Sequence, residues 1–229
     1  MKDLFKKYEI ELDETELKLF EKFLKIFIEK NSQINLSAIR EENAIIEKHF
    51  IDSIMLPIFW KPDWKVLDLW TWWGFPGIPL RIVSDEDVDF TLVDSIWKKV
   101  KVVNEFIEEL WLKNIKAIQA RAEDLWQDKN HREKYDLVVS RATAYLPTLL
   151  EYTIPLLKVW WVFASYKLEN EEEVKDAQKA LNTLWAEIMD KKTYKIWWQE
   201  RVILFIQKIE ETPKKYPRIV WEPLKNPIK

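Results

Sequence analysis

Glycine is nearly absent from this chain. Its 229 residues include 2 Gly and 14 Trp, whereas an average glycine usage of about 7% would give roughly 16 Gly. Glycine is the residue that tight turns and close backbone approaches to a ligand depend on. As written, the sequence therefore lacks the glycine-rich loops that enzymes of this size ordinarily carry.

Cysteine is absent and histidine is rare. The lack of Cys excludes a disulfide framework, a thiolate metal site and a cysteine nucleophile. The two histidines, His49 and His131, are too few for a typical His-based metal centre, so no metal is expected. No apolar run approaches the roughly 18 residues of a membrane span, and the N-terminus does not resemble a signal peptide. A cytoplasmic protein that does not associate with membranes is expected.

Charge is unevenly distributed. The net charge is −3, which argues against a uniformly basic surface for nucleic acid. Residues 190–229 nevertheless carry ten Lys/Arg against five Asp/Glu, a local excess of five positive charges. This basic tail is either a surface that binds phosphates or a solvated, weakly ordered terminus.

The stretch Val66–Leu80, VLDLWTWWGFPGIPL, combines a buried strand, a tight turn and the beginning of a helix. Proteins of the α/β class use this arrangement to present backbone N–H groups to a nucleotide-like ligand. The turn contains Trp70, Trp72 and Trp73 at positions where φ > 0 and close ligand approach call for glycine.

Other tryptophans also occupy positions typical of glycine. Trp111 and Trp185 end helical patterns, where a left-handed residue is wanted. The pairs at 160–161 and 197–198 lie where Gly-Gly turns are expected between an element and the next strand. We interpret most or all of the tryptophans as standing at glycine positions of a parent sequence, through deliberate substitution or an error in the written sequence. The alternative is a natural Trp-rich protein with aromatic clusters in its core or on a nucleic-acid surface.

With glycine at 70 and 72, the loop becomes Asp-x-Gly-x-Gly-x-Gly, ending at Gly74. It then resembles the first motif of class I S-adenosylmethionine-dependent methyltransferases. The string GFPGIPL over 74–80 is similar to the bacterial RsmG (GidB) family, the small-subunit ribosomal RNA guanine-N7 methyltransferases. The resemblance covers nearly the whole chain and includes Asn35-Leu36-Ser37, His49-x-x-Asp52-Ser53, Ser140-Arg141-Ala142, Tyr216-Pro217-Arg218 and Pro223-x-Lys225-x-Pro227.

Strands and helices alternate from Lys65 onward, which predicts a parallel sheet covered on both faces. Strands are expected at 65–69, 89–93, 115–119, 135–140, 161–166, 187–196 and 201–208, and helices at 77–84, 96–110, 122–126, 146–157 and 170–184. The last two strands have no helix between them, so they should form an antiparallel hairpin. The predicted fold is an α/β class I methyltransferase (Rossmann-like) sheet, mostly parallel, with an antiparallel C-terminal hairpin.

Two further segments flank this sheet. A capping-box pattern at Asp13–Glu16 opens an amphipathic helix, and a second helical pattern follows around 45–54, giving an N-terminal helical cap. The predicted division is 1–60 for the cap, 61–211 for the methyltransferase domain and 212–229 for a basic, proline-rich tail of irregular structure.

The resemblance implies S-adenosyl-L-methionine as cofactor and a set of cofactor-binding residues. Asp94 would accept the ribose hydroxyls, Ala122 and Glu123 would contact the adenine, and Arg141 would hold the cofactor carboxylate or an RNA phosphate. Arg141 is also the one candidate for a catalytic role, with a surface ion pair as the alternative. The complete expected set is Asp68, Trp70, Gly74, Phe75, Asp94, Ala122, Glu123 and Arg141.

The expected substrate is 16S ribosomal RNA or the small ribosomal subunit, bound by a monomer. Candidate RNA-binding residues are His49, Lys98, Lys167, Arg218 and Lys225. A packed core histidine and solvated lysines are the alternatives for these positions.

Two absences bear on the reaction. Methylation at C5 of a pyrimidine needs a nucleophile, normally cysteine, and the Asn/Asp-Pro-Pro-aromatic string of amino-group methyltransferases is missing. Guanine N7 carries an exposed lone pair and needs no general base, so alignment and electrostatic support suffice. A Rossmann-type NAD-dependent oxidoreductase and, if the tryptophans are genuine, a non-catalytic RNA-binding protein remain alternatives.

Overall fold

A computed structural model describes residues 1–61, 64–141 and 144–229, and within them the chain builds one seven-stranded sheet. Its order is β3-β2-β1-β4-β5-β7-β6. Strand β7 runs antiparallel to both of its neighbours, and the pairs among β1 to β5 are parallel. The mostly parallel sheet with an antiparallel C-terminal hairpin is therefore confirmed. The strands are β1 Lys65–Leu69, β2 Asp89–Asp94, β3 Ile115–Gln119, β4 Tyr135–Ser140, β5 Leu157–Leu168, β6 Ala186–Ile196 and β7 Gln199–Lys208.

The strand order reverses at β1. The chain passes from β1 to β2 and β3 on one side, then crosses to β4 on the other side of β1. In open α/β sheets, ligands bind in the crevice outside the carboxyl ends of the strands at such a switch point. The segments after Leu69 and after Ser140 meet at this edge.

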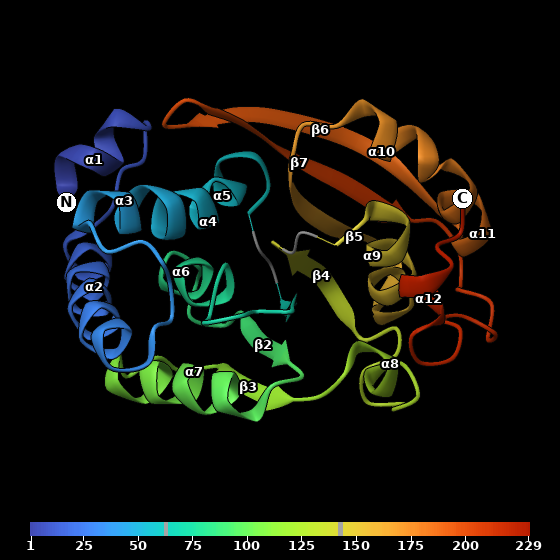
Figure 1. The fold of residues 1–229 in the computed structure, drawn as a ribbon, viewed down its shortest axis with the longest axis horizontal. Helices are drawn as coiled ribbons and strands as arrows, with labels where there is room; N and C mark the ends of the chain where they lie inside the picture. Colours follow the sequence, from blue (N-terminus) through green and yellow to red (C-terminus); the bar gives the residue numbers. More distant parts are fainter. Residues whose placement is uncertain (62–63, 142–143) are drawn as a thin grey trace.

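Helices cover both faces of the sheet (Figure 1). Alternate residues of β1 face opposite sides: Val66 belongs to a core packed under α2, α6 and α7, and Leu67 to one packed under α8, α9 and α11. The helices before β1 are α1 Lys2–Lys7, α2 Glu14–Ile34, α3 Glu42–Ile45, a π-helix η1 Ile46–Ile51, α4 Asp52–Ile54 and α5 Leu56–Phe59. Those after it are α6 Gly77–Ile82, α7 Trp97–Glu109, α8 Ala122–Leu125, α9 Leu146–Thr153, the 3-10 turn η2 Ile154–Leu156, α10 Glu171–Asp176, α11 Gln178–Leu184 and α12 Glu222–Lys225.

The N-terminal helices pack onto the loop that follows β1. The predicted capping box is present: Asp13 accepts from the N–H of Glu16, and the Glu16 side chain accepts from the N–H of Asp13. Helix α2 buries an aromatic stripe whose Phe23 ring stacks on Phe75, with centroids 5.6 Å apart. The cap therefore supports one side of the loop at the sheet edge. The domain boundaries proposed from the sequence stay a prediction.

The tryptophans concentrate at left-handed backbone positions. Among the described residues, twelve non-glycine residues have positive φ, and eight of them are Trp: Trp64, Trp70, Trp72, Trp111, Trp160, Trp185, Trp197 and Trp221. L side chains disfavour this region by roughly 1–2 kcal/mol per residue. The interpretation of these positions as glycine positions is supported by the backbone. Trp73, by contrast, is absent from this set and is buried in the core, so the expectation of positive φ there is wrong.

Three expected elements differ from the structure. Strand β5 begins at Leu157 rather than 161, and Trp160 lies inside it at a register shift between β4 and β5 rather than in a turn. The helix expected over 170–184 is interrupted at Ala177. The tail contains the short helix α12 and packs on α9. Within the described ranges, no helix is long and apolar enough to cross a membrane.

Candidate active site

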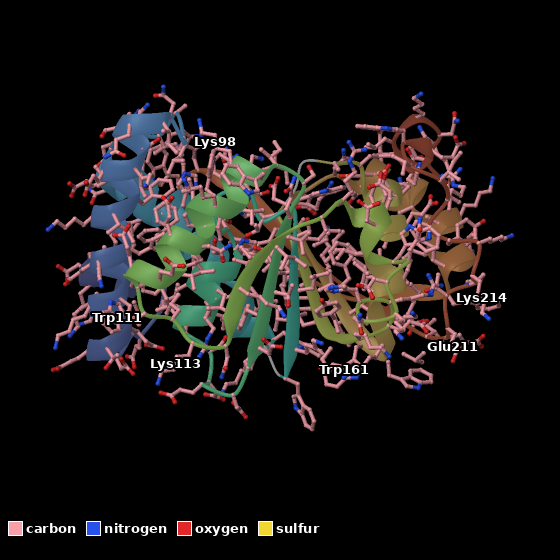
Figure 2. All side chains as sticks on the ribbon, turned by 90° about the horizontal axis from the view of Figure 1, so that it is seen from below. Lys98, Trp111, Lys113, Trp161, Glu211 and Lys214 are labelled. Carbon is pink, nitrogen blue, oxygen red and sulfur yellow. The ribbon has the colours of Figure 1, made fainter. Side chains whose placement is uncertain are left out.

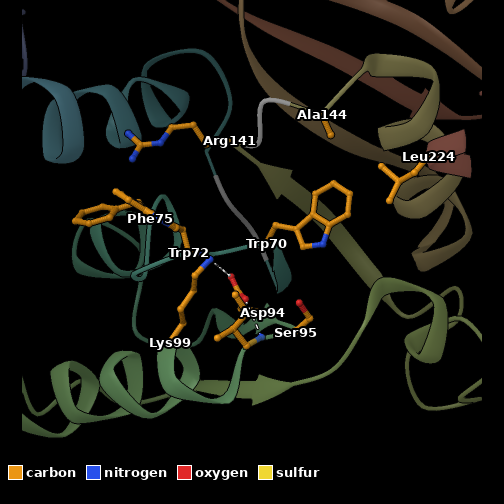
Figure 3. Close-up of a pocket in the computed structure, with 10 residues that line it drawn as sticks. Trp70, Trp72, Phe75, Asp94, Ser95, Lys99, Arg141, Ala144 and Leu224 are labelled. Carbon is orange, nitrogen blue, oxygen red and sulfur yellow. Dashed lines mark hydrogen bonds and ion pairs between the residues drawn. The ribbon is translucent and has the colours of Figure 1, made fainter. Parts of the chain in front are cut away.

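A cleft of about 540 Å³ opens at the carboxyl ends of β1, β2 and β4 (Figure 3). We call it the main cleft. Its walls come from segments far apart in sequence: the loop after β1, the end of β2 with the start of α7, the segment after β4, and α12. The lining residues are Trp70, Trp72, Phe75, Asp94, Ser95, Ile96, Lys99, Arg141, Ala144 and Leu224.

Asp68 shapes the loop from behind. Its Oδ2 accepts a hydrogen bond from the N–H of Gly77 at 2.8 Å, which ties the end of β1 to the start of α6. A Cβ at Gly77 would lie 2.8 Å from this oxygen and 2.7 Å from Leu92 Cγ, so only glycine permits the close packing. Burial raises the pKa of Asp68 to about 7, although the nearby Thr71 hydroxyl and the hydrogen bond from the Gly77 N–H act in the opposite direction. Asp68 is fully buried and holds the loop's shape.

The middle of the loop needs glycine for a different reason. Gly74 has φ +93°, and a Cβ there would lie 2.5 Å from Ile78 Cδ1. Its neighbour Phe75 is buried, stacks on the His49 ring at 5.0 Å between centroids and forms part of the cleft wall. The GFPG string therefore turns the backbone sharply and anchors it in the aromatic core.

Trp70 projects into the main cleft. Its φ is 62°, and its indole makes an edge contact with Tyr152, with centroids 5.4 Å apart. The indole borders the main cleft and also a small cavity of about 130 Å³, which is lined in part by Ala122, Glu123 and Tyr152. Figure 3 shows the ring standing between Asp94 and Leu224. It therefore forms part of the wall that the main cleft and the small cavity share.

Asp94 ends β2 beside the loop. Its carboxylate accepts from the N–H of Ile96 at 3.0 Å and of Trp72 at 3.2 Å, and Lys99 Nζ lies 3.4 Å away (Figure 3). These bonds orient the carboxylate at the cleft wall, where an acid can accept ribose hydroxyls.

Ala122 and Glu123 begin α8, next to the small cavity. Glu123 Oε1 accepts from the Tyr152 hydroxyl at 3.1 Å. Burial and the adjacent Glu123 raise the pKa of Tyr152, so its hydroxyl stays protonated. The structure thus brings the loop, Asp94, Ala122 and Glu123 together at one edge of the sheet, and their role in binding a cofactor stays a prediction.

Arg141 joins the sheet to the N-terminal cap. Its Nη1 donates to Lys48 O at 2.9 Å and to Asp52 Oδ2 at 3.1 Å, and its guanidinium lies over the Phe75 ring. Asp52 is buried and also accepts from Arg201 Nη2 at 2.8 Å. Arg141 therefore forms a nearly buried ion pair with Asp52 at the cleft. The alternative of a surface ion pair for Arg141 is wrong.

Arg141 also borders a second cavity of about 550 Å³, which we call the side cavity. Tyr145, Tyr166, Lys167 and Arg201 are among its lining residues. Sequence reasoning did not identify Arg201 or Tyr194, whose hydroxyl donates to Asp52 Oδ1 at 2.8 Å. No local motif marks these two residues, although Asp52 is part of the His-x-x-Asp-Ser string.

His49 lies in the aromatic core and away from solvent. Its Nε2 is 3.1 Å from Ser37 Oγ, and burial lowers its pKa to about 3, so the ring is neutral. This geometry favours the packed-core alternative over contact with RNA.

The cationic candidates divide into two groups. Lys98 and Lys225 are exposed, and Figure 2 shows Lys98 at the molecule's edge. Lys167 is nearly buried and pairs with Glu173 at 2.5 Å, and Arg218 pairs with the fully buried Glu151 at 2.7 Å. Lys167 and Arg218 therefore form intramolecular ion pairs rather than free cationic surface groups. Ala142 lies outside the described residues, and in the part of the chain that is described no His/Asp/Glu group could hold a metal ion.

Comparisons with known proteins address the identity of the chain. The sequence model of a family described as GidB, rRNA small subunit methyltransferase G, matches residues 16–197. A protein named ribosomal RNA small subunit methyltransferase G from Acetivibrio thermocellus is 41% identical over 222 residues, covering 96% of this chain and 91% of that protein. The protein of the same name from Fusobacterium nucleatum is 40% identical over 235 residues and covers 100% of both chains.

Solved structures share the fold at low sequence identity. An O-methyltransferase from Bacillus cereus in complex with S-adenosylhomocysteine has a TM-score of 0.60 at 15% identity, covering 90% of this chain and 96% of that one. A SAM-dependent methyltransferase from Aquifex aeolicus has a TM-score of 0.56 at 17% identity, covering 72% and 93%. The class I methyltransferase fold is thus confirmed, and so is the family resemblance: the chain belongs to the GidB family of rRNA small subunit methyltransferase G proteins.

Proposed function

We propose that this protein is built to transfer a methyl group from S-adenosylmethionine to N7 of a guanine in small-subunit (16S) ribosomal RNA. The observation that carries the proposal is the main cleft, which gathers the loop after β1, Asp94 and Arg141 at the switch point of the sheet. Family membership supplies the class of reaction, and the site supplies residues suited to it.

The polar groups at the cleft fit the parts of this cofactor. Asp94 would accept the ribose hydroxyls, and the cavity beside Ala122 and Glu123 would take the adenine. Arg141 would hold the carboxylate of the methionine end by a charge-assisted bond. Its described hydrogen bonds all use Nη1, so Nε and Nη2 have no described hydrogen-bond partner and would be the donors to that carboxylate.

The side chain at position 70 does not fit. The Trp70 indole stands between the two spaces that the ribose and adenine would share. We therefore propose the activity for the chain with glycine at positions 70 and 72, and we expect the sequence as written to bind the cofactor poorly.

The chemistry asks little of the protein beyond positioning. Guanine N7 has a lone pair in the ring plane and loses no proton when it attacks the methyl sulfonium. Effective alignment of two reactants lowers the barrier by several kcal/mol, up to roughly 7–11. Arg141 would fix the methyl donor, and the buried Asp52 would fix Arg141.

The side cavity offers a route for the acceptor base. It shares Arg141 with the main cleft and carries the aromatic rings of Tyr145 and Tyr166 together with Arg201. A flipped base stacks on aromatic side chains in enzymes that act on single nucleotides. The exposed cations Lys98 and Lys225 would contact phosphates outside the pocket.

One experiment tests the proposal directly. The Trp70→Gly/Trp72→Gly variant is incubated with isotopically labelled S-adenosylmethionine and 16S RNA or small subunits from a strain lacking the modification, and the digested RNA is analysed by mass spectrometry. Labelled 7-methylguanosine is the expected product. Label on another base, or binding of NAD in place of S-adenosylhomocysteine by calorimetry, would refute the assignment.

A further inference from the structure

The last 21 residues form a continuous strap, residues 209–229, that runs from the end of β7 to the main cleft. Its first part is fixed by Arg132, which donates to Thr212 O at 2.8 Å and to Tyr216 O at 2.9 Å. Glu133 accepts from the N–H of Thr212 at 3.2 Å. The strap is therefore held by the segment before β4 and is not a loosely attached tail.

The centre of the strap is held by a buried charge. Arg218 donates to Glu151 of α9 through its backbone N–H at 2.7 Å, through Nε at 2.9 Å and through Nη2 at 2.7 Å. The Glu151 side chain is 0% exposed, whereas Arg218 is 27% exposed. A buried carboxylate requires a partner, because an unpaired one carries a large desolvation cost. The ion pair therefore ties the strap to one place on α9.

The end of the strap reaches the ligand-binding region. Thr148 of α9 donates to Pro223 O at 2.8 Å, which seats α12 on α9. Leu224 on α12 then borders both the main cleft and the small cavity, and Trp221 borders the small cavity. Figure 3 shows Leu224 across from Asp94, with the Trp70 ring between them.

We propose that the strap forms the outer wall of the adenosine pocket and that the Arg218–Glu151 ion pair is its positioning anchor. This inference rests on the proposed function, because it takes the main cleft and small cavity as the cofactor site. Arg218 and Glu151 do not touch the cofactor themselves. They hold Leu224 in place, and Leu224 supplies an apolar surface against the adenosine.

The anchor role differs from an RNA-binding role in what it predicts. If Arg218 bound RNA, its removal would affect RNA affinity and the dependence of that affinity on salt, and it would leave cofactor affinity alone. An anchor affects cofactor affinity, and Glu151→Gln should act like Arg218→Gln although Glu151 is buried and cannot reach RNA. The two single changes should also be non-additive, because each removes the same interaction.

The test uses the Trp70→Gly/Trp72→Gly protein and four variants made in it: Arg218→Gln, Glu151→Gln, the double variant with both of these changes, and Leu224→Ala. Calorimetry with S-adenosylhomocysteine should show at least tenfold weaker binding for the two anchor variants and several-fold weaker binding for Leu224→Ala. The KM for S-adenosylmethionine should rise while kcat and the KM for RNA stay near those of the parent. Hydrogen exchange should accelerate in residues 218–229 of the anchor variants. Leu224 is 46% exposed, so its variant keeps the test valid if an anchor variant fails to fold.

Glu222→Gln is a matched control, because Glu222 is a partly exposed partner of the same arginine, 3.7 Å from Arg218 Nη1. It should change cofactor affinity less than twofold. Unchanged cofactor affinity in Leu224→Ala and the anchor variants would overturn the strap proposal alone. A salt-dependence change in Arg218→Gln without one in Glu151→Gln would reassign Arg218 to RNA. If the parent variant itself does not bind S-adenosylhomocysteine, the proposed function fails, and the role of the strap fails with it.

Discussion

Replacing Trp70 and Trp72 by glycine should convert a chain that binds S-adenosylmethionine poorly into one that binds it at micromolar concentration. Both residues have left-handed backbones, with φ of 62° and 58°, and both border the main cleft. The sequence alone favours changing Trp73 as well. The structure argues against that change, because the Trp73 indole is 8% exposed within the core, and deleting a buried aromatic costs about 3–5 kcal/mol.

The effect on stability should be small. A left-handed conformation costs a non-glycine residue roughly 1–2 kcal/mol, and glycine removes that cost. Glycine also adds freedom to the unfolded chain, which offsets about 0.4–1 kcal/mol per site. The substitutions further remove the packing of the Trp70 and Trp72 indoles on Tyr152 and His49. These opposing contributions leave a net change in unfolding free energy near zero.

The effect on binding should be large, and its size identifies the mechanism. If the Trp70 ring could rotate out of the cleft, exposing it would cost about 1.5–3 kcal/mol, a weakening of about 10-fold to 150-fold. If the ring cannot leave without moving the loop, the Kd should rise from micromolar beyond millimolar, which corresponds to more than about 4 kcal/mol. We expect the second result, because the ring is packed against Tyr152 and its backbone is fixed between β1 and the Asp68–Gly77 hydrogen bond.

Isothermal titration calorimetry with S-adenosylhomocysteine measures this difference. Trp111→Gly is the matched control: Trp111 has φ 58° and is 83% exposed just after the end of α7, whereas the cleft is lined by residues at the start of that helix. Figure 2 shows Trp111 far from Lys98, which lies in the first turn of α7. This control should raise Tm by about 2–4 °C, for roughly 1 kcal/mol of relieved strain in a chain of this size, and should not create binding. Micromolar binding by the unmodified chain would contradict the reasoning and would mean that this loop is not the cofactor loop.

Three further predictions concern other parts of the site. Arg141→Ala should abolish most methylation in the Trp70→Gly/Trp72→Gly protein while leaving Tm nearly unchanged, because Asp52 keeps Arg201 as a partner; a low Tm with normal specific activity would make Arg141 structural. The unfolding free energy of the unmodified chain should decrease as pH rises from about 4 to 7. Asp68→Asn should remove this decrease. The folded pKa of Asp68 is raised to about 7 above an unfolded value of about 3.9, so the folded state holds the proton longer and stability falls across this window by roughly 4 kcal/mol; denaturant titrations at both pH values would measure it, and an equal dependence on pH in both proteins would count against it. Replacing the exposed tail cations Lys214, Lys215 and Lys225 by Gln should flatten the salt dependence of RNA binding, by about 0.7–0.9 in log–log slope for each phosphate that the tail no longer neutralises. An unchanged slope in filter-binding assays would mean that the tail does not touch RNA.

The sheet could be predicted because its signals are local. Strands at 65–69, 115–119 and 135–140 have the expected bounds, since each is a short apolar run between turn signals. The predicted start of β5 at residue 161 is wrong, because β5 begins at Leu157. The Trp160–Trp161 pair correctly indicates a left-handed residue, and Trp160 has φ 72°. That residue sits at a register shift in a continuous strand, and a bulge and a turn carry the same local sequence signal.

The site could be predicted in part for a similar reason. Asp94, Ala122 and the β1 loop are placed by the carboxyl ends of parallel strands, which sequence order already brings to one edge. The partners of Arg141 and Arg218 could not be predicted. Arg141 and Asp52 are separated by 89 residues and Arg218 and Glu151 by 67, and single-sequence patterns hold no information on such pairings. The assignment of Arg218 to RNA failed to anticipate its pairing with Glu151 for this reason.

The distribution of tryptophan along the backbone carries a physical consequence of its own. The four other non-glycine residues with positive φ among those described are Glu9, Asn35, Asn114 and Glu133, and the two asparagines are of the type that tolerates this region. Tryptophan does not tolerate this region well. At roughly 1–2 kcal/mol for each of the eight residues, the combined strain is comparable to the 5–15 kcal/mol that stabilises a whole domain. A polypeptide made to the written sequence should therefore fold poorly, and a variant with glycine at exposed left-handed sites such as Trp111 and Trp160 should have a Tm higher by about 2–4 °C per site. Intact-mass measurement of the purified protein, followed by thermal melts of both, tests this: a mass matching the written sequence together with a Tm typical of stable domains would show that the fold tolerates these residues at far lower cost than their backbone angles imply.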